Sequence, residues 1–327
     1  MTGISVIIPS NHDHIALCAV VRAICNQLLI PSEIIIVDSS EGQGACPTEI
    51  AVMCEHCDIK LIYENCKLAL PGKARNIGLD LSSGEFIAFI DVQTIPRPEW
   101  LNASLVQLKI NNIAGVWGAT SFRAENIFER LVRDGIYGLI PKKTLPGSVF
   151  RSETFRITGQ FIDWIRAGED TEWMLRLDIL KINVGHSSSA LVDYVGLIGV
   201  SLQQLLKKWH RNYTVSKELP HFFPQRLLLW LIMYPMIVLI AFNWNYLIAD
   251  WRMDSPLYIG HVTKIVAILP IFIYIIVRGF IWPLQRGVSL LQLLPIRFIA
   301  ISSVCFLIDF VKALVFSLPR RNIKKKN

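Results

Sequence analysis

Acidic residues occur at three places where side-chain chemistry is expected. Asp38 ends the apolar run EIIIVD, Asp91 ends the run EFIAFID, and Glu169 and Asp170 form the acidic pair of a GED triplet. A carboxylate can accept a proton as a general base or bind a hard divalent cation. Any one of these acids could instead be a helix cap or a turn former. Three acidic positions in this order along the chain favour a functional site.

Four apolar runs and the segments between them would position these acids. The runs are rich in β-branched residues and nearly continuous, which is typical of parallel strands covered on both faces. They are ISVIIP (4–9), EIIIVD (33–38), IKLIYE (59–64) and EFIAFID (85–91). Segments long enough for crossover helices lie between them, at about 13–29, 47–57 and 72–82. The pattern predicts an open, mostly parallel α/β sheet.

Residues directly after these strands become candidates for a binding site, because ligands of open α/β sheets bind outside the carboxyl ends of the strands. The candidates are Pro9 to Asn11, Asp38 to Ser40, and Asp91 to Thr94. The first strand is followed by SNHDH, and the sequence contains neither a GxGxxG motif nor a Walker phosphate loop. These absences argue against a Rossmann dinucleotide site and a P-loop.

Four blocks of sequence resemble the ordered motifs of family 2 glycosyltransferases, which have the GT-A fold. The blocks are ISVIIPSN, EIIIVDSS, GKARNIGLDLSSGEFIAFIDVQTIPRPEWL (72–101) and GQFIDWIRAGEDTEWMLRL (159–177). The resemblance covers about residues 4–195. Its most specific parts are ARNxGL followed by the strand ending in Asp91, the pair Trp100-Leu101, and GEDxExxxR. The family consists of inverting enzymes that take a sugar from a nucleotide donor.

The resemblance implies roles for the three acidic sites. Asp38 would hydrogen-bond the nucleotide base, Asp91 would be the first residue of the DxD motif, and Asp170 would be the general base. Such a transfer also needs positive charge near the leaving diphosphate. Lys73 and Arg75 open the helix after residue 71, where backbone amides and basic side chains suit phosphate. Solvated helix charges are the alternative for these two cations.

The GED region offers two further site residues with structural alternatives. Glu169 stands beside the expected base, although two adjacent carboxylates are also typical of a solvated helix start. Arg176 lies six residues after Asp170 on the expected helix. Arg176 would either act within the site, by forming an ion pair or by binding phosphate, or form an ordinary structural salt bridge outside it.

The sequence departs from the family pattern at the metal motif. Family members usually carry a second acid two residues after the first, whereas this chain reads Asp91-Val92-Gln93. We expect a divalent cation, Mg²⁺ or Mn²⁺, bound weakly by Asp91 with the Gln93 amide oxygen as a neutral ligand. The alternative is that Lys73, Arg75 or another cation stabilises the leaving group without a metal. The alternative function is a catalytically weak homologue that serves as a membrane partner subunit of a glycan-assembly complex.

The composition indicates that part of the chain lies in lipid. Of 327 residues 52% are hydrophobic and 18% charged, and the mean hydropathy is +0.42, which is too apolar for two soluble domains. Residues 227–249 and 257–282 are long enough to cross a bilayer, with Lys264 and Arg278 of the second expected to reach the interface. Segment 288–318 carries several charges and is expected to lie in the interface, or to dip into the membrane and return.

Basic residues flank the apolar block. The net charge is +7, and the cations cluster at KKWHR (207–211) and RRNIKKK (320–326). This placement favours anionic lipid headgroups over nucleic acid as the partner. The residues expected at the membrane interface are Lys207, Lys208, Trp209 and Arg211, with a merely basic linker helix as the alternative.

The expected organisation is therefore a GT-A catalytic domain (1–200), a basic interfacial linker (201–225), a membrane domain (226–318) and a basic tail (319–327). The domain and the tail are expected in the cytosol. A lipid-linked glycan or polyprenyl phosphate would be the acceptor class. Cysteines 46, 54, 57 and 66 are interpreted as small apolar residues, with a zinc site at Cys54-Glu-His-Cys57 as the alternative.

Overall fold

The computed structural model describes residues 3–11, 13–40, 45–187, 189, 191–217, 225–247 and 252–318. The predicted basic tail 319–327, part of the linker and the end of the predicted span 227–249 lie outside the described residues. The chain divides into two compact units. Unit 1 contains residues 1–129 and 139–200, and unit 2 contains residues 130–138 and 201–327.

Unit 1 is built on a nine-stranded sheet with strand order β3-β2-β1-β4-β7-β6-β9-β5 and with β8 paired to β6. The strands are β1 (Ile4–Ser10), β2 (Glu33–Asp38), β3 (Lys60–Asn65), β4 (Phe86–Phe89), β5 (Thr94–Pro96), β6 (Gly115–Phe122), β7 (Lys142–Arg151), β8 (Val184–His186) and β9 (Val192–Tyr194). The first four strands are parallel, and β7 joins β4 and β6 in antiparallel fashion. The predicted open, mostly parallel α/β sheet is confirmed.

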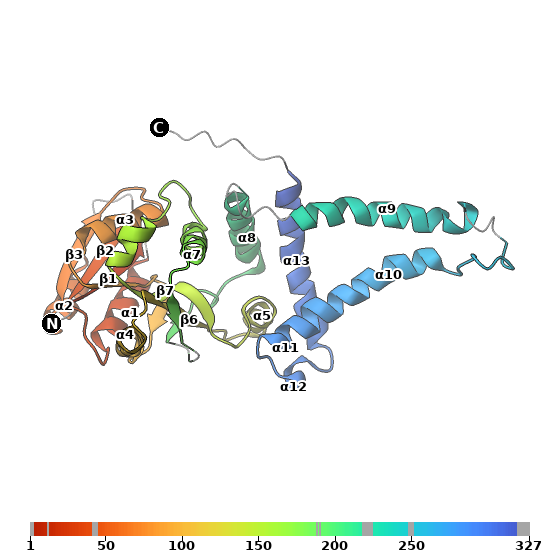
Figure 1. Ribbon diagram of the computed structural model, residues 1–327. Coiled ribbons are helices and arrows are strands. Elements are labelled where there is room, and N and C mark those ends of the chain that lie inside the picture. Colours follow the sequence, from red (N-terminus) through yellow and green to blue (C-terminus); the bar gives the residue numbers. More distant parts are fainter. Residues whose placement is uncertain are drawn as a thin grey trace. The chain divides into compact units, whose positions relative to one another are not determined.

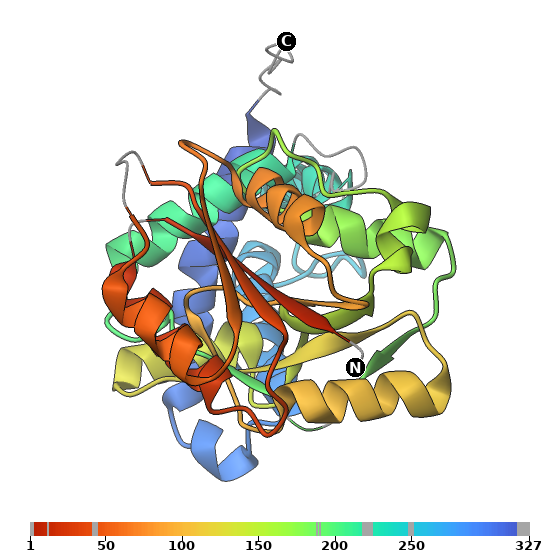
Figure 2. The same cartoon turned by 90° about the vertical axis from the view of Figure 1, so that its left-hand side faces the viewer.

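Helices cover both faces of this sheet, as Figures 1 and 2 show. They are α1 (His14–Cys25), α2 (Thr48–His56), α3 (Pro71–Leu81), α4 (Trp100–Asn111), α6 (Glu153–Thr158) and α7 (Glu169–Ile179). Helix α5 (Ile127–Val132) crosses the boundary between the two units. The side chains of β1 alternate between the two faces, as the period of two along a strand requires. Val6 and Ile8 pack in the cluster that contains Val20 and Ile24 of α1, whereas Ile7 packs in the cluster of the opposite face.

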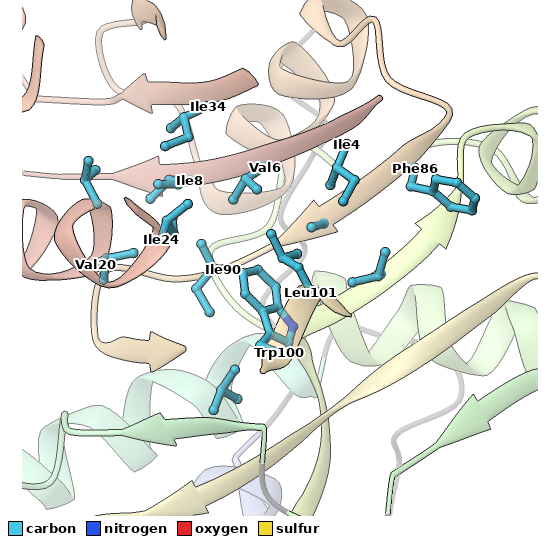
Figure 3. Packing of buried hydrophobic residues seen from close by; sticks show 14 of the residues in the cluster. Ile4, Val6, Ile8, Val20, Ile24, Ile34, Phe86, Ile90, Trp100 and Leu101 are labelled. Carbon is cyan, nitrogen blue, oxygen red and sulfur yellow. The ribbon is translucent and has the colours of Figure 1, made fainter. Parts of the chain in front are cut away.

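Trp100 anchors the start of α4 in the core (Figure 3). Its ring is fully buried, and its indole Nε1 donates to the Gly147 carbonyl of β7 at 2.6 Å. Leu101 beside it is also fully buried. A buried indole needs such a partner for its N–H. The Trp-Leu pair therefore fixes the chain a few residues after β5, in the segment that follows Asp91.

Unit 2 is helical over its described residues. It contains a π-helical turn η1 (Arg133–Tyr137), α8 (Leu202–Ser216), α9 (Gln225–Leu247), α10 (Val262–Ile275), a second π-helical turn η2 (Ile276–Ile281), α11 (Trp282–Gln285), α12 (Leu290–Leu293) and α13 (Arg297–Ser317). Among the residues with described side chains, Ile268–Gln285 and Arg297–Ser317 are long and apolar enough to cross a membrane. Helix α9 has 23 residues and overlaps the first predicted span.

Candidate active site

The carboxyl ends of three adjacent strands bring the predicted residues together. Strand β1 lies between β2 and β4, and Ser10 of β1 is in register with Asp38 of β2. Asp91 follows β4 by two residues. Pro9 lies within β1, and Asn11 directly follows that strand and is exposed. This edge is where ligands of open α/β sheets bind.

Asp38 is held in place by three hydrogen bonds. Its carboxylate accepts from the Ser40 amide at 3.1 Å, the Ser40 hydroxyl at 2.8 Å and the Tyr63 hydroxyl at 2.7 Å. Burial raises the pKa of Tyr63, and the hydrogen bond to Asp38 raises it further, so Tyr63 stays a proton donor. Tyr63 was not singled out from the sequence. The pairing of β2 with β3 is what brings it to Asp38.

Arg75 is buried between two carboxylates. Its Nη1 donates to Glu169 Oε1 at 2.6 Å and its Nη2 to Asp91 Oδ1 at 2.9 Å. The side chains of Arg75 and Glu169 are 4% and 6% exposed, and that of Asp91 is 36% exposed. Arg75 therefore lies behind the site, where it links the β4 end to the start of α7. In this arrangement both carboxylates engage the Arg75 guanidinium. Arg75 therefore positions the two acids and is not presented to a diphosphate.

Two glycines allow α3 to bring Arg75 this close. A Cβ atom on Gly72 would lie 1.9 Å from the Ile162 carbonyl oxygen, and one on Gly78 would lie 2.4 Å from the Ile7 side chain. Gly72, Arg75 and Gly78 are three residues apart and so share one helix face. This face packs against the sheet and the segment before α7. Lys73, in contrast, is exposed at the start of the same helix.

The electrostatics of the Arg75 cluster favour a charged guanidinium. Burial alone would lower the pKa of Arg75, but the charges of Asp91, Glu169 and Asp170 raise it. Burial raises the pKa of Glu169, and Arg75 opposes this shift. Arg75 Nε and Glu169 Oε2 are buried and have no hydrogen-bond partner among the described residues. Removing Arg75 would thus leave the buried Glu169 carboxylate without its counter-charge, whereas removing Glu169 would leave Arg75 paired with Asp91.

The GED pair divides its two carboxylates between core and surface. Glu169 points inward to Arg75, whereas Asp170 is partly exposed and its Oδ1 accepts from the Thr171 amide at 2.7 Å. Asp170 also lies close enough for its charge to act on Arg75 and Glu169. The arrangement can present Asp170 to a hydroxyl group beside Asp91.

Arg176 makes the contacts of an ordinary structural salt bridge, which was the alternative to a role in the site. It pairs with Glu172, one turn earlier on α7, and donates to the carbonyls of Thr158 at 2.7 Å and Gln160 at 2.9 Å. These bonds tie α7 to the end of α6. The partners that the structure gives to Arg176 are therefore those of a local brace.

Gln93 is exposed in the turn directly before β5, and its carbonyl accepts from the Val195 amide after β9. Its Oε1 accepts from the Tyr194 hydroxyl at 3.2 Å. Together with Asp91 it offers one carboxylate and one amide oxygen, and the described residues contain no group of three His, Cys, Asp or Glu that could hold a metal. This donor set fits a divalent cation whose remaining ligands come from the donor diphosphate, and not a cation held by the protein alone.

Asp193 of β9 forms an ion-pair network that was not predicted. It pairs with Arg97 at 3.0 Å and with Arg123 at 2.8 Å. Burial would raise the pKa of Asp193, but the hydrogen bonds and charges of the two arginines hold it below its usual range. The network joins β9, the segment after β5 and the end of β6.

The cysteines of the zinc alternative make other contacts. Cys54 is buried in the core, and the thiol of Cys57 donates to the Cys25 carbonyl at 3.9 Å. Cys46 is half-buried beside the same cluster. In the described part of the chain these thiols pack as small apolar residues.

Comparison with known proteins defines the class to which this site belongs. The model of glycosyl transferase family 2 matches residues 5–167. The solved mannosyltransferase PcManGT from Pyrobaculum calidifontis, in complex with GDP-Man and Mn²⁺, superposes with a TM-score of 0.58 at 12% identity, over 94% of this chain and 86% of that one. The fold is thus GT-A, and the chain belongs to glycosyl transferase family 2.

Curated relatives include two further glycosyltransferases. The chain is 28% identical over 177 residues to the pre-mycofactocin glycosyltransferase of Mycobacterium tuberculosis, a match that covers 49% of this chain and 37% of that protein. It is 24% identical over 226 residues to glycosyltransferase AglE of Haloferax volcanii, which covers 64% of this chain and 71% of that protein. The chain therefore spans little more than a third of the first of these relatives.

Proposed function

We propose that this protein is an inverting glycosyltransferase that moves a sugar from a nucleotide donor to an acceptor close to the membrane. The observation that carries the proposal is the cluster of Asp91, Arg75, Glu169 and Asp170 at the carboxyl ends of the central strands. Membership of family 2 and the nucleotide-sugar complex of the mannosyltransferase neighbour support it. A lipid-linked glycan or polyprenyl phosphate is the proposed acceptor class.

In this mechanism Asp170 takes the proton of the acceptor hydroxyl as its oxygen attacks the anomeric carbon. The bond between that carbon and the diphosphate oxygen breaks on the opposite side, so the configuration inverts. Glu169 and Arg75 hold the start of α7 and Asp91 in fixed relation. A divalent cation, bound by the diphosphate, Asp91 and Gln93, would supply positive charge to the leaving group. Lys73, exposed at the start of α3, is the protein cation proposed to contact phosphate.

Donor binding should depend on Asp38. We expect a nucleotide sugar to raise the thermal stability of the purified protein, because it binds the folded state. Asp38→Asn removes the acceptor charge but keeps the shape, and should abolish most of this shift. The exposed Asp58→Asn variant is the control. Absence of a shift with UDP, GDP, dTDP and CMP sugars would support the alternative function instead.

That alternative, a catalytically weak partner subunit, is favoured by Gln93. The amide oxygen has replaced a charged metal ligand and accepts a hydrogen bond from Tyr194. Donor binding without transfer to any acceptor would fit it.

The metal concentration that transfer requires should reflect that Asp91 is the one carboxylate proposed to bind the cation. We expect transfer to fall in EDTA and to return with Mn²⁺ or Mg²⁺, at higher metal concentrations than Gln93→Asp requires. Gln93→Asp adds a charged ligand, whereas Asn102→Asp adds the same charge at an exposed position of α4 and should not change the requirement. Full activity of the wild-type protein in chelator would contradict the proposed cation.

A further inference from the structure

Helix α13 is fastened at its first residue to a segment adjoining the glycosyltransferase domain. Arg297 Nη2 lies 2.6 Å from Asp134 Oδ2, and the Asp134 side chain is 1% exposed. Asp134 belongs to the turn η1, within the stretch 130–138 of unit 2. That stretch is joined by one peptide bond at each end to unit 1, at Glu129 and Leu139. It must therefore lie on the same side of a membrane as unit 1.

The other end of α13 is fastened to the end of α8. Lys217 is buried, and its ammonium group donates to the carbonyls of Val315, at 2.9 Å, and Leu318. The rings of Tyr213 and Phe316 also pack together, with centroids 6.3 Å apart. Helix α8 begins at Leu202, two residues after the last residue of unit 1. Its amphipathic, charged sequence places it outside the hydrocarbon core.

Both ends of α13 therefore belong to one side of the membrane. The helix has 21 residues and is about 32 Å long at 1.5 Å per residue, which would suffice to cross a hydrocarbon core of about 30 Å. A crossing would place Arg297 and Val315 on opposite sides, whereas their partners Asp134 and Lys217 lie on the same side. Length and composition permit a span, but the attachments of the two ends exclude it.

The middle of α13 is also unsuited to the bilayer centre. Arg278 of η2 forms a two-pronged ion pair with Asp309, at 2.7 and 3.1 Å, and the Tyr274 hydroxyl donates to the same carboxylate at 2.9 Å. Arg278 was expected to reach the interface, and the ion pair with Asp309 was not predicted. Ionised groups are costly in the hydrocarbon core and cheaper near the headgroups. Figure 1 shows α13 running across the base of the hairpin of α9 and α10, which it contacts.

One face of α13 carries exposed apolar side chains. Ile299, Phe306, Phe310 and Leu314 are 45–57% exposed and follow the helical repeat, whereas Ile301 on the packed face is buried. Exposed apolar residues continue along α10. An apolar stripe of this kind, beside a hairpin long enough to enter the bilayer, fits lipid as its occupant.

We infer that α13 lies in the plane of the membrane surface, on the side of the glycosyltransferase domain, with its stripe Ile299, Phe306, Phe310 and Leu314 immersed in bilayer lipid. The inference goes beyond the proposed transfer reaction and does not depend on it. It requires that the hairpin of α9 and α10 enters the membrane. Helix α13 then holds segment 130–138 at the level of the headgroups.

Depth-dependent quenching of fluorescence tests this placement. A small fluorescent amino acid is placed singly at positions 299, 306, 310 and 314 of the full chain, in vesicles of phosphatidylcholine and phosphatidylglycerol brominated at different acyl positions. The same probe at Leu239, an exposed residue of α9, is the deep control. We expect one shallow depth at the four positions, equal within about 5 Å, because an in-plane helix keeps its residues level.

Other outcomes would overturn the inference. A spanning α13 would spread positions 299 to 314 over about 22 Å of depth at 1.5 Å per residue. Four unquenched probes beside a quenched Leu239 position would show that the stripe does not contact lipid. A second readout is a cysteine added after residue 327, which should react with an impermeant reagent under the same conditions, intact or permeabilised cells, as a cysteine at the exposed Asp58 of unit 1; opposite accessibility of the two would contradict the placement. None of these measurements requires sugar transfer, so failure of the proposed function would leave their meaning unchanged.

Discussion

Asp170→Asn is expected to lower sugar transfer by about 10²–10⁴-fold, while donor binding stays near the wild-type value. The amide keeps the shape and the hydrogen bond to Thr171 but cannot take the acceptor proton. Glu169 cannot substitute for it, because that carboxylate is buried against Arg75. Transfer rates at saturating donor, together with the donor-induced thermal shift, separate the chemical step from binding.

A matched control lies on the same helix. Asp178 is exposed and stands 3.9 Å from Lys143, so Asp178→Asn removes the same charge from α7 without touching the site. It should retain nearly full transfer. If Asp170→Asn keeps more than about half of the wild-type rate, Asp170 is not the base.

In the parallel half of the sheet, β1, β2 and β4 were predictable because they are buried on both faces, whereas the edge strand β3 is partly exposed and was recognised by its apolar run alone. Strands buried on both faces appear as continuous β-branched runs, and β1 to β4 lie where those runs occur. The antiparallel part had no such signal. Strands β5 and β9 have three residues each, and β7 contains a proline and a glycine. These strands are specified by pairing with distant partners, which local patterns do not report.

The site was predicted unevenly for the same reason. Asp38, Asp91 and the GED pair were recognisable because a strand end or a motif marks them. The inward orientation of Arg75 follows from tertiary packing of α3, although the spacing of Gly72, Arg75 and Gly78 was a signal that one face of this helix is packed closely. Tyr63 and the attachment of Asp134 to Arg297 depend on contacts between distant segments. Neither leaves a mark in the local sequence.

Arg75→Met is expected to lower the free energy of unfolding by about 3–5 kcal/mol, the usual cost of removing one partner of a buried ion pair. Methionine fills much of the space of the arginine stem, so the loss of charge dominates. Glu169 is left buried without its partner, and Glu169 Oε2 already has no hydrogen-bond partner among the described residues. Thermal unfolding of the full-length protein in detergent measures the loss.

The double variant Arg75→Met, Glu169→Gln tests the cause. It removes both charges, so most of the stability lost in Arg75→Met should return, while transfer stays low because Asp91 and the start of α7 are no longer linked.

The loss of stability in Arg75→Met should also depend on pH. Without Arg75, burial raises the pKa of Glu169 further above its unfolded value, so the folded state binds more protons and stability falls as pH rises through that range. The destabilisation should therefore be smaller at pH 5 than at pH 8. An equal loss at both pH values, or a double variant no more stable than Arg75→Met, would show that packing and not charge compensation is the role of Arg75.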